Sequence, residues 1–199
     1  MGEVFLQISA IPIAYLIGSI PFGFLLTKIF KKQNIQQVGS GNIGATNVMR
    51  VAGKKLGIVT FCLDGLKGVL AVYVCFNFFT IEGVLLKNLV IISTVLGHIY
   101  PVWLKFKGGK GVATLIVIVS YTSPMMCLMM VVSWCIFYKM FYIVSLASVV
   151  AMVSVFAYQI SFHDDYLISS VILASLVIYK HFANIKRLLA GEETSFKQE

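Results

Sequence analysis

The sequence predicts an all-α membrane protein with seven transmembrane helices, two of them short, with the N-terminus outside and the C-terminus inside the cell. Three observations lead to this fold class. Hydrophobic residues make up 59% of the 199 residues and charged residues only 12%, against about 45–50% and about 25% in soluble proteins. The mean hydropathy is +0.91. The apolar residues also gather in runs near the roughly 20 residues that a spanning helix needs.

The apolar runs follow one another along the whole chain. They cover residues 4–26, 56–79, 84–104, 112–138, 141–160 and 166–179. The run 112–138 is interrupted at Thr122, Ser123 and Pro124, so it forms either one kinked helix or two short ones. Since the chain is too short for these spans and two further soluble domains, we expect one domain over residues 1–199.

The basic residues decide whether residues 112–138 form one helix or two. Lysine and arginine are concentrated in residues 28–55, 105–110 and 180–197, and the positive-inside rule places all three segments on the cytoplasmic side. The turns at 80–88 and 162–165 carry one lysine between them and should face outward. A single crossing by residues 112–138 would bring the turn at 162–165 inside. Two short crossings hinged at Ser123 and Pro124 avoid this conflict, with local bilayer thinning or shallow insertion.

The first long loop contains a segment suited to anions. Residues 39–50 have the sequence GSGNIGATNVMR. Glycines allow backbone N–H groups to approach an anion closely, and arginine can hold a phosphate with two hydrogen bonds. An ordinary glycine-rich turn with a lipid-facing arginine is the alternative. The candidate residues are Ser40, Gly41, Asn42, Gly44, Asn47 and Arg50.

The same segment matches the GxGxxG pattern of a dinucleotide site, and Asp64 lies twenty residues beyond Gly44. Such a site requires a buried strand before the glycines. Residues 34–38, NIQQV, are not a buried strand, and Asp64 falls inside an apolar run. The dinucleotide interpretation is therefore excluded.

The second basic loop, residues 105–114, has the sequence KFKGGKGVAT. It is not a Walker A motif, because Gly111 stands where a serine or threonine must hold magnesium. Glycine amides and Lys110 still precede a helix, whose N-terminus favours an anion. A positive-inside anchor with a flexible turn is the alternative. The candidates are Gly108, Gly109, Lys110 and Gly111.

Further polar residues lie near or inside the apolar runs. His181 and Asn184 are spaced to share a helix face, and His181 could act as a base, bind an anion or be a simple surface histidine. Asp64 and Lys67 have the same spacing inside a span, where each charge costs roughly 2.5–3.5 kcal/mol. We interpret them as structural partners for each other and for the site, and His98 as a packed histidine.

Several classes of chemistry have no motif here. There is no GxSxG elbow, no histidine followed five residues later by aspartate, and no cluster with metal-ligand spacing. The four cysteines lie in apolar runs without a CxxC pair, as buried hydrophobic residues do. The net charge of +8 mainly reflects topology and also attracts anionic substrates or lipids. We expect no metal, no cofactor and no nucleic-acid partner.

These motifs together resemble the bacterial membrane acyl-phosphate:glycerol-3-phosphate acyltransferase family. The resemblance covers essentially the whole chain, in order. It is carried by residues 40–50, by residues 108–114, by His181, Asn184, Arg187, Gly191 and Glu193, and by the shorter segments 18–23, 64–68, 97–101 and 144–148. Two departures concern helix packing: residues 139–142 lack an arginine that is often found before Ser145, and residues 115–118 lack a common glycine.

The resemblance implies a function and roles for individual residues. The reaction is acyl transfer from acyl phosphate to the sn-1 hydroxyl of glycerol-3-phosphate, giving lysophosphatidic acid at the cytoplasmic face of the bacterial inner membrane. Ser40 and Arg50 would be essential, the glycine-lysine loop would bind glycerol-3-phosphate, and His181 and Asn184 would complete the site. Ser145 would take part in binding, and Glu193 would be structural.

The mechanism that fits these residues is direct attack by the substrate hydroxyl on the acyl phosphate. An acyl phosphate carries a good leaving group and needs no ATP, and the absence of a nucleophile elbow argues against an acyl-enzyme. The proton could pass to His181 or to a substrate phosphate oxygen. A transporter for a phosphorylated solute and a non-catalytic membrane scaffold are the alternatives, although few polar residues occur near the midplane for transport.

Overall fold

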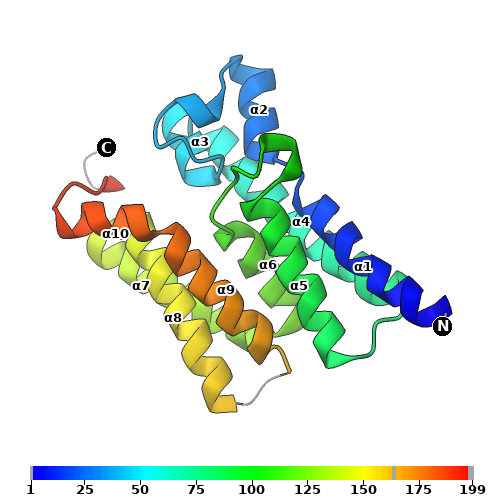
Figure 1. Cartoon of the computed structure of the whole chain (residues 1–199). Helices are drawn as coiled ribbons and strands as arrows, with labels where there is room; N and C mark the ends of the chain where they lie inside the picture. Colours follow the sequence, from blue (N-terminus) through cyan, green and yellow to red (C-terminus); the bar gives the residue numbers. More distant parts are fainter. Residues whose placement is uncertain (1, 163–164, 197–199) are drawn as a thin grey trace. The chain divides into compact units, whose positions relative to one another are not determined.

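The computed structural model describes residues 2–162 and 165–196, and no strand occurs among them (Figure 1). These residues form two compact units, the first ending at Ile118 and the second beginning at Val119. Each unit is described by itself. Part of the turn predicted at 162–165 falls on residues 163 and 164, outside the described part of the chain.

The first unit contains three long helices and the loops between them. α1 lies alongside α4 and α5 (Figure 1). The elements in chain order are α1 (Gly2–Gly18), α2 (Phe22–Lys31), the 3-10 turn η1 (Ile35–Gln37), α3 (Ala45–Ala52), α4 (Lys54–Phe78), α5 (Val84–Ile99), the 3-10 turn η2 (Val102–Leu104) and the start of α6 (Val112–Thr122).

The first apolar run is broken between α1 and α2 by Pro21, which precedes Phe22. Proline has no N–H group and cannot continue the helical hydrogen-bond pattern. The carbonyl group of Ile20, at this break, accepts the N–H of Phe22 at 3.2 Å.

Glycines allow helices in this unit to pack with their backbones close together. A Cβ atom at Gly18 of α1 would collide with the carbonyl group of Thr94 in α5, and one at Gly97 of α5 would collide with that of Tyr15 in α1. Because lipid supplies no hydrophobic force between helices, close packing of this kind holds membrane helices together.

α4 and α6 meet in the same way. A Cβ atom at Gly68 would lie 2.7 Å from Cγ2 of Thr114 and 3.0 Å from its carbonyl oxygen, and one at Gly65 would collide with Val117. The start of α6, which directly follows the glycine-lysine loop, is thus packed tightly against α4.

The second unit contains the end of α6 and four further helices: α7 (Pro124–Phe141), α8 (Val144–Phe162), α9 (Leu167–Lys180) and α10 (Phe182–Leu189). α8 packs against both α7 and α9 (Figure 1). The hydroxyl groups of Ser133 in α7 and Ser154 in α8 lie 2.9 Å apart. The axes of α9 and α10 differ by 51°.

The helix break predicted at Ser123 and Pro124 is confirmed, because α6 ends at Thr122 and α7 begins at Pro124. α6 is short, as expected. α7 is not: its 18 residues are long and apolar enough to cross a membrane. Within the described residues five helical segments meet this criterion, or six if α9 and α10 form one bent span. Seven crossings and their orientation stay predictions.

A larger side chain at Gly68 tests the close contact between α4 and α6. We expect Gly68→Leu to destabilise the protein by about 1–3 kcal/mol, because the added side chain overpacks the contact with Thr114. Thermal unfolding in detergent measures the change. Gly83→Leu is the matched control, since no atom lies within 4 Å of a Cβ placed there. Equal losses in both variants would contradict this account.

Candidate active site

The first candidate loop is shaped by the side-chain amide of Asn47, which is 2% exposed. Its Oδ1 accepts a hydrogen bond from the N–H of Ser40 at 2.9 Å. Its Nδ2 donates to the carbonyl oxygens of Val38 at 3.1 Å and Asn42 at 2.8 Å. A loop without regular structure must satisfy its backbone groups through such partners. Asn47, predicted as a binding residue, thus has a structural role in this loop.

Ser40 is exposed at the tip of this loop. It lies between Gly39 and Gly41, whose φ angles of 59° and 70° suit glycine far better than other residues. Gly44 precedes α3 and donates its N–H to Oδ1 of Asn42 at 2.8 Å. Arg50 lies half-buried in the last turn of α3.

The glycines of the second loop have a different role from the one that their sequence suggests. The N–H of Gly108 donates to the carbonyl oxygen of Ile99 at 3.1 Å, and that of Gly109 to the carbonyl oxygen of His98 at 3.0 Å. A Cβ atom at Gly109 would collide with the His98 ring. In this conformation the two amides are engaged with carbonyl groups rather than directed at an anion. The half-buried Lys110 is the remaining cationic candidate here.

The structure brings the two loops of the first unit together. Nε2 of Gln36 donates to the carbonyl oxygen of Lys107 at 2.8 Å. Leu104 packs against a small core formed by Ile35, Ile43 and Val48. In Figure 1 the segment after η2 accordingly lies beside α2 and α3.

The pairing predicted for Asp64 and Lys67 is confirmed. Nζ of Lys67 lies 2.7 Å from Oδ1 of Asp64, and both side chains are buried. The ammonium group also donates to the carbonyl oxygen of Ile20 at 2.6 Å, the group next to Pro21. Nδ1 of His98 lies 3.6 Å from Oδ1 of Asp64. No local sequence pattern connects His98 with this pair, because His98 lies at the end of α5 and the pair lies in α4.

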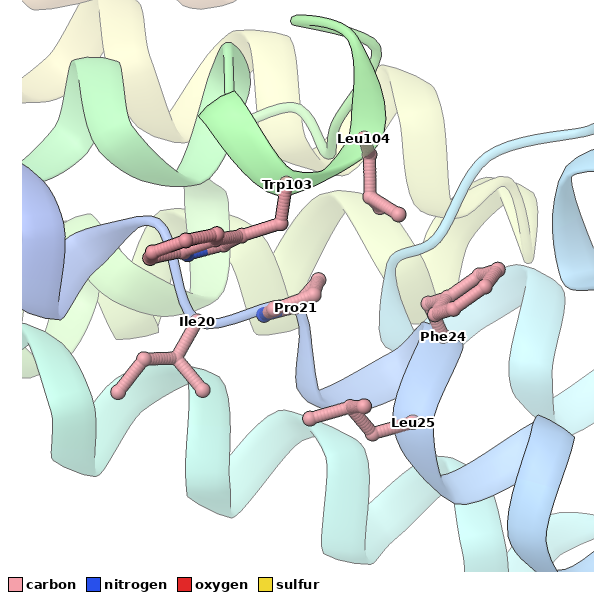
Figure 2. A pocket seen from close by; sticks show the side chains of 6 residues that line it. All are labelled: Ile20, Pro21, Phe24, Leu25, Trp103 and Leu104. Atoms are coloured by element: carbon pink, nitrogen blue, oxygen red, sulfur yellow. The ribbon is translucent and has the colours of Figure 1, made fainter.

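A shallow apolar groove of about 340 Å³ lies at the break between α1 and α2 (Figure 2). In Figure 2 the Trp103 ring extends toward Ile20 and Pro21. The lining suits a hydrocarbon chain rather than an ion. It consists of Ile20, Pro21, Phe24, Leu25, Trp103 and Leu104.

In the second unit three side chains converge on Glu193, whose side chain is 4% exposed. Oε1 accepts hydrogen bonds from Oγ of Ser145 at 2.8 Å and from Nδ2 of Asn184 at 2.6 Å. Oε2 accepts from Nε of Arg187 at 2.8 Å. Burial raises the pKa of Glu193, but the hydrogen bonds from Asn184, Ser145 and Arg187 outweigh it and hold the pKa below its ordinary value.

Three of the site residues predicted in this unit are therefore linked, because Ser145 and Asn184 are both bonded to Glu193, the residue expected to be structural. Arg187 was not among the predicted site residues. Its place in the motif of residues 181–193 was the available signal, but the sequence does not show that the chain turns back after α10.

His181 lies at the junction of α9 and α10 and is 3% exposed. Its Nδ1 lies 2.8 Å from the carbonyl oxygen of Val177. A carbonyl oxygen only accepts hydrogen bonds, so Nδ1 carries the hydrogen. In the neutral ring the lone pair is then on Nε2, which is the atom able to take up a proton.

Each of the two units, taken separately, presents its own set of polar groups. The first unit presents the exposed hydroxyl group of Ser40 and the cations of Arg50 and Lys110, which suit phosphate oxygens. The second holds an amide and a histidine whose orientations are fixed by hydrogen bonds. Such groups bind anions and orient or deprotonate a hydroxyl group.

Comparison with known proteins agrees with this chemistry. The family model described as glycerol-3-phosphate acyltransferase matches residues 8–191. A glycerol-3-phosphate acyltransferase of Pelagibacter ubique is 45% identical over 92% of this chain and 94% of its own length. One of Aquifex aeolicus is 41% identical over 92% and 95%.

Two solved structures are similar over 98% of this chain and 96% of their own, each at 39% identity. Both are crystal structures of PlsY (YgiH), an integral membrane glycerol 3-phosphate acyltransferase. The glycerol 3-phosphate form has a TM-score of 0.87, and the lysophosphatidic acid form has a TM-score of 0.84. On the family model and these identities, the chain belongs to the glycerol-3-phosphate acyltransferase family.

Proposed function

We propose that this protein transfers a fatty acyl group from an acyl phosphate to the sn-1 hydroxyl of glycerol-3-phosphate, giving lysophosphatidic acid and inorganic phosphate. The observation that carries this proposal is the likeness to PlsY, at 39% identity and a TM-score of 0.87, because its two forms are named for glycerol 3-phosphate and lysophosphatidic acid. These are the acceptor and the product of such a transfer.

The acyl donor is proposed from chemistry. An acyl phosphate is a mixed anhydride, so attack of the glycerol hydroxyl oxygen on the acyl carbon breaks the bond to phosphate without ATP. The hydroxyl proton passes to His181 or to a phosphate oxygen. The glycine-lysine loop, which lacks the Walker serine or threonine, fits a reaction in which no nucleotide is bound.

Lys110 and Arg50 would hold phosphate oxygens and stabilise the charge on the departing phosphate. The hydroxyl group of Ser40, which is exposed, would donate a further hydrogen bond. The apolar groove at the α1–α2 break offers a surface for the acyl chain, because its lining residues are apolar.

His181 and Asn184 would orient glycerol-3-phosphate, with Ser145 assisting. Glu193 serves them indirectly, because its carboxylate accepts hydrogen bonds from both Asn184 and Ser145. A bound and oriented substrate reacts faster because translational and rotational freedom has already been lost.

The proposal includes a topology. The chain acts as one domain that crosses the bacterial inner membrane seven times, with the N-terminus outside and the active site at the cytoplasmic face. The distribution of lysine and arginine supports this orientation. α6 would cross where the bilayer is thinned or enter it only partly, since it has 11 residues.

The direct test uses purified protein in detergent with a saturated fatty acyl phosphate and radiolabelled glycerol-3-phosphate. We expect labelled lysophosphatidic acid and inorganic phosphate in equal amounts, and no product when an acyl-CoA replaces the acyl phosphate. Absence of product, together with uptake of glycerol-3-phosphate into vesicles containing the protein, would instead indicate a transporter. A burst of acylated protein without acceptor would exclude direct attack.

The cations can be tested one at a time. We expect Lys110→Ala and Arg50→Ala each to lower kcat/KM by about 100-fold or more, as when one donor to a developing negative charge is removed. Lys55→Ala is the matched control, because Lys55 is exposed at the start of α4. Activity in Lys110→Ala equal to that of the control would contradict the proposed role.

The carboxylate of Glu193 gives a pH-dependent prediction. A lowered pKa in the folded state adds stability above the ordinary value of 4.5, and that stability is lost as the pH falls through the lowered pKa. We therefore expect Glu193→Gln to have a lower Tm than the wild type at pH 7, with the difference disappearing at strongly acidic pH. Glu192→Gln, at an exposed neighbour, should match the wild type throughout. A difference that grows on acidification would refute this.

A further inference from the structure

Three ionisable side chains meet in the interior of the first unit. Asp64 and Lys67 of α4 and His98 of α5 are each at most 3% exposed. Oδ1 of Asp64 lies 2.7 Å from Nζ of Lys67 and 3.6 Å from Nδ1 of His98. We call these three residues the buried charge cluster.

Stability alone does not account for this cluster. Removing two charges from water costs several kcal/mol per ion, and their attraction often fails to recover that cost. Oδ2 of Asp64 is buried and accepts no hydrogen bond within the described residues. Incompletely satisfied buried polar groups are often found where function requires them.

The cluster is connected to the segment just before Lys110. The carbonyl oxygen of His98 accepts the N–H of Gly109 at 3.0 Å. The His98 ring also lies where a side chain on Gly109 would be. His98 thus supports the glycine-lysine loop, residues 105–111, at Gly109.

The cluster is also connected to the segment just after Lys110. Oγ1 of the buried Thr114 donates to the carbonyl oxygen of Asp64 at 3.0 Å. Lys110 therefore lies between two anchored points, Gly109 on His98 and Thr114 on Asp64. Lys67 joins a third segment to the cluster through the carbonyl oxygen of Ile20 at 2.6 Å.

We propose that the buried charge cluster positions Lys110 for binding glycerol-3-phosphate. His98 supports the loop before Lys110, and the pair of Asp64 and Lys67 fixes the part of α4 to which Thr114 is bonded. This inference rests on the proposed function of Lys110. Asp64, Lys67 and His98 are positioning residues and do not touch the substrate.

The test compares two variants that perturb the cluster differently. His98→Ala removes the ring that supports Gly109. The double variant Asp64→Asn/Lys67→Met removes both charges and leaves none unpaired, so it tests the cluster even if His98→Ala fails to fold. Thr94→Val is the control, because Thr94 is equally buried in α5 but donates only to Val90 of its own helix.

In each of the two cluster variants we expect the KM for glycerol-3-phosphate to rise about tenfold, less than the roughly 100-fold loss that a misplacement of about 1 Å can cause. The KM for acyl phosphate should change by less than about twofold. A merely structural defect would lower the fraction of active enzyme and leave both KM values unchanged. Unchanged KM for glycerol-3-phosphate, or an equal rise for both substrates, overturns the proposal.

A double-mutant cycle with Lys110→Ala shows whether the effect acts through Lys110. In that background we expect the further effect of each cluster variant on KM for glycerol-3-phosphate to fall below about twofold, and full additivity overturns the proposal. If Lys110→Ala by itself leaves this KM unchanged, the proposed function of Lys110 fails instead, and the two failures are distinguishable.

Discussion

The ion pair between Asp64 and Lys67 is the interaction on which the first unit depends. In a membrane, polar backbone groups must find partners within the protein, because lipid offers none. Pro21 interrupts the helix, and the Ile20 carbonyl at the break accepts hydrogen bonds from the N–H of Phe22 and from the ammonium group of Lys67. Asp64 compensates the charge that this donor brings. The break between α1 and α2, the start of α6 and the loop before Lys110 are all connected to this pair.

The same constraint shapes the other candidate segments. In each, one buried polar side chain satisfies backbone or side-chain groups that regular structure does not. Asn47 does so for the loop that presents Ser40, and Glu193 does so for Ser145 and Asn184 in the second unit. Functional groups are thereby held in defined positions, as catalysis requires.

Glycine next to lysine does not by itself make an anion-binding loop. The sequence of residues 105–111 suggested glycine amides open to phosphate, yet the amides of Gly108 and Gly109 donate to carbonyl groups of α5. Glycine is required there because the loop passes directly over the His98 ring. Lys110, which is half-buried, is the cationic candidate that remains in this motif.

The sequence by itself determined what depends on neighbouring residues. The apolar runs predicted the helices, Ser123 and Pro124 predicted the break before α7, and the spacing of Asp64 and Lys67 predicted their pairing, because helical periodicity is local. The ordered motifs predicted the family. Only the tertiary structure showed that His98 lies beside Asp64 and that Arg187 and Asn184 share Glu193. These features arise where separate elements pack together, and no short stretch of sequence records which elements will meet.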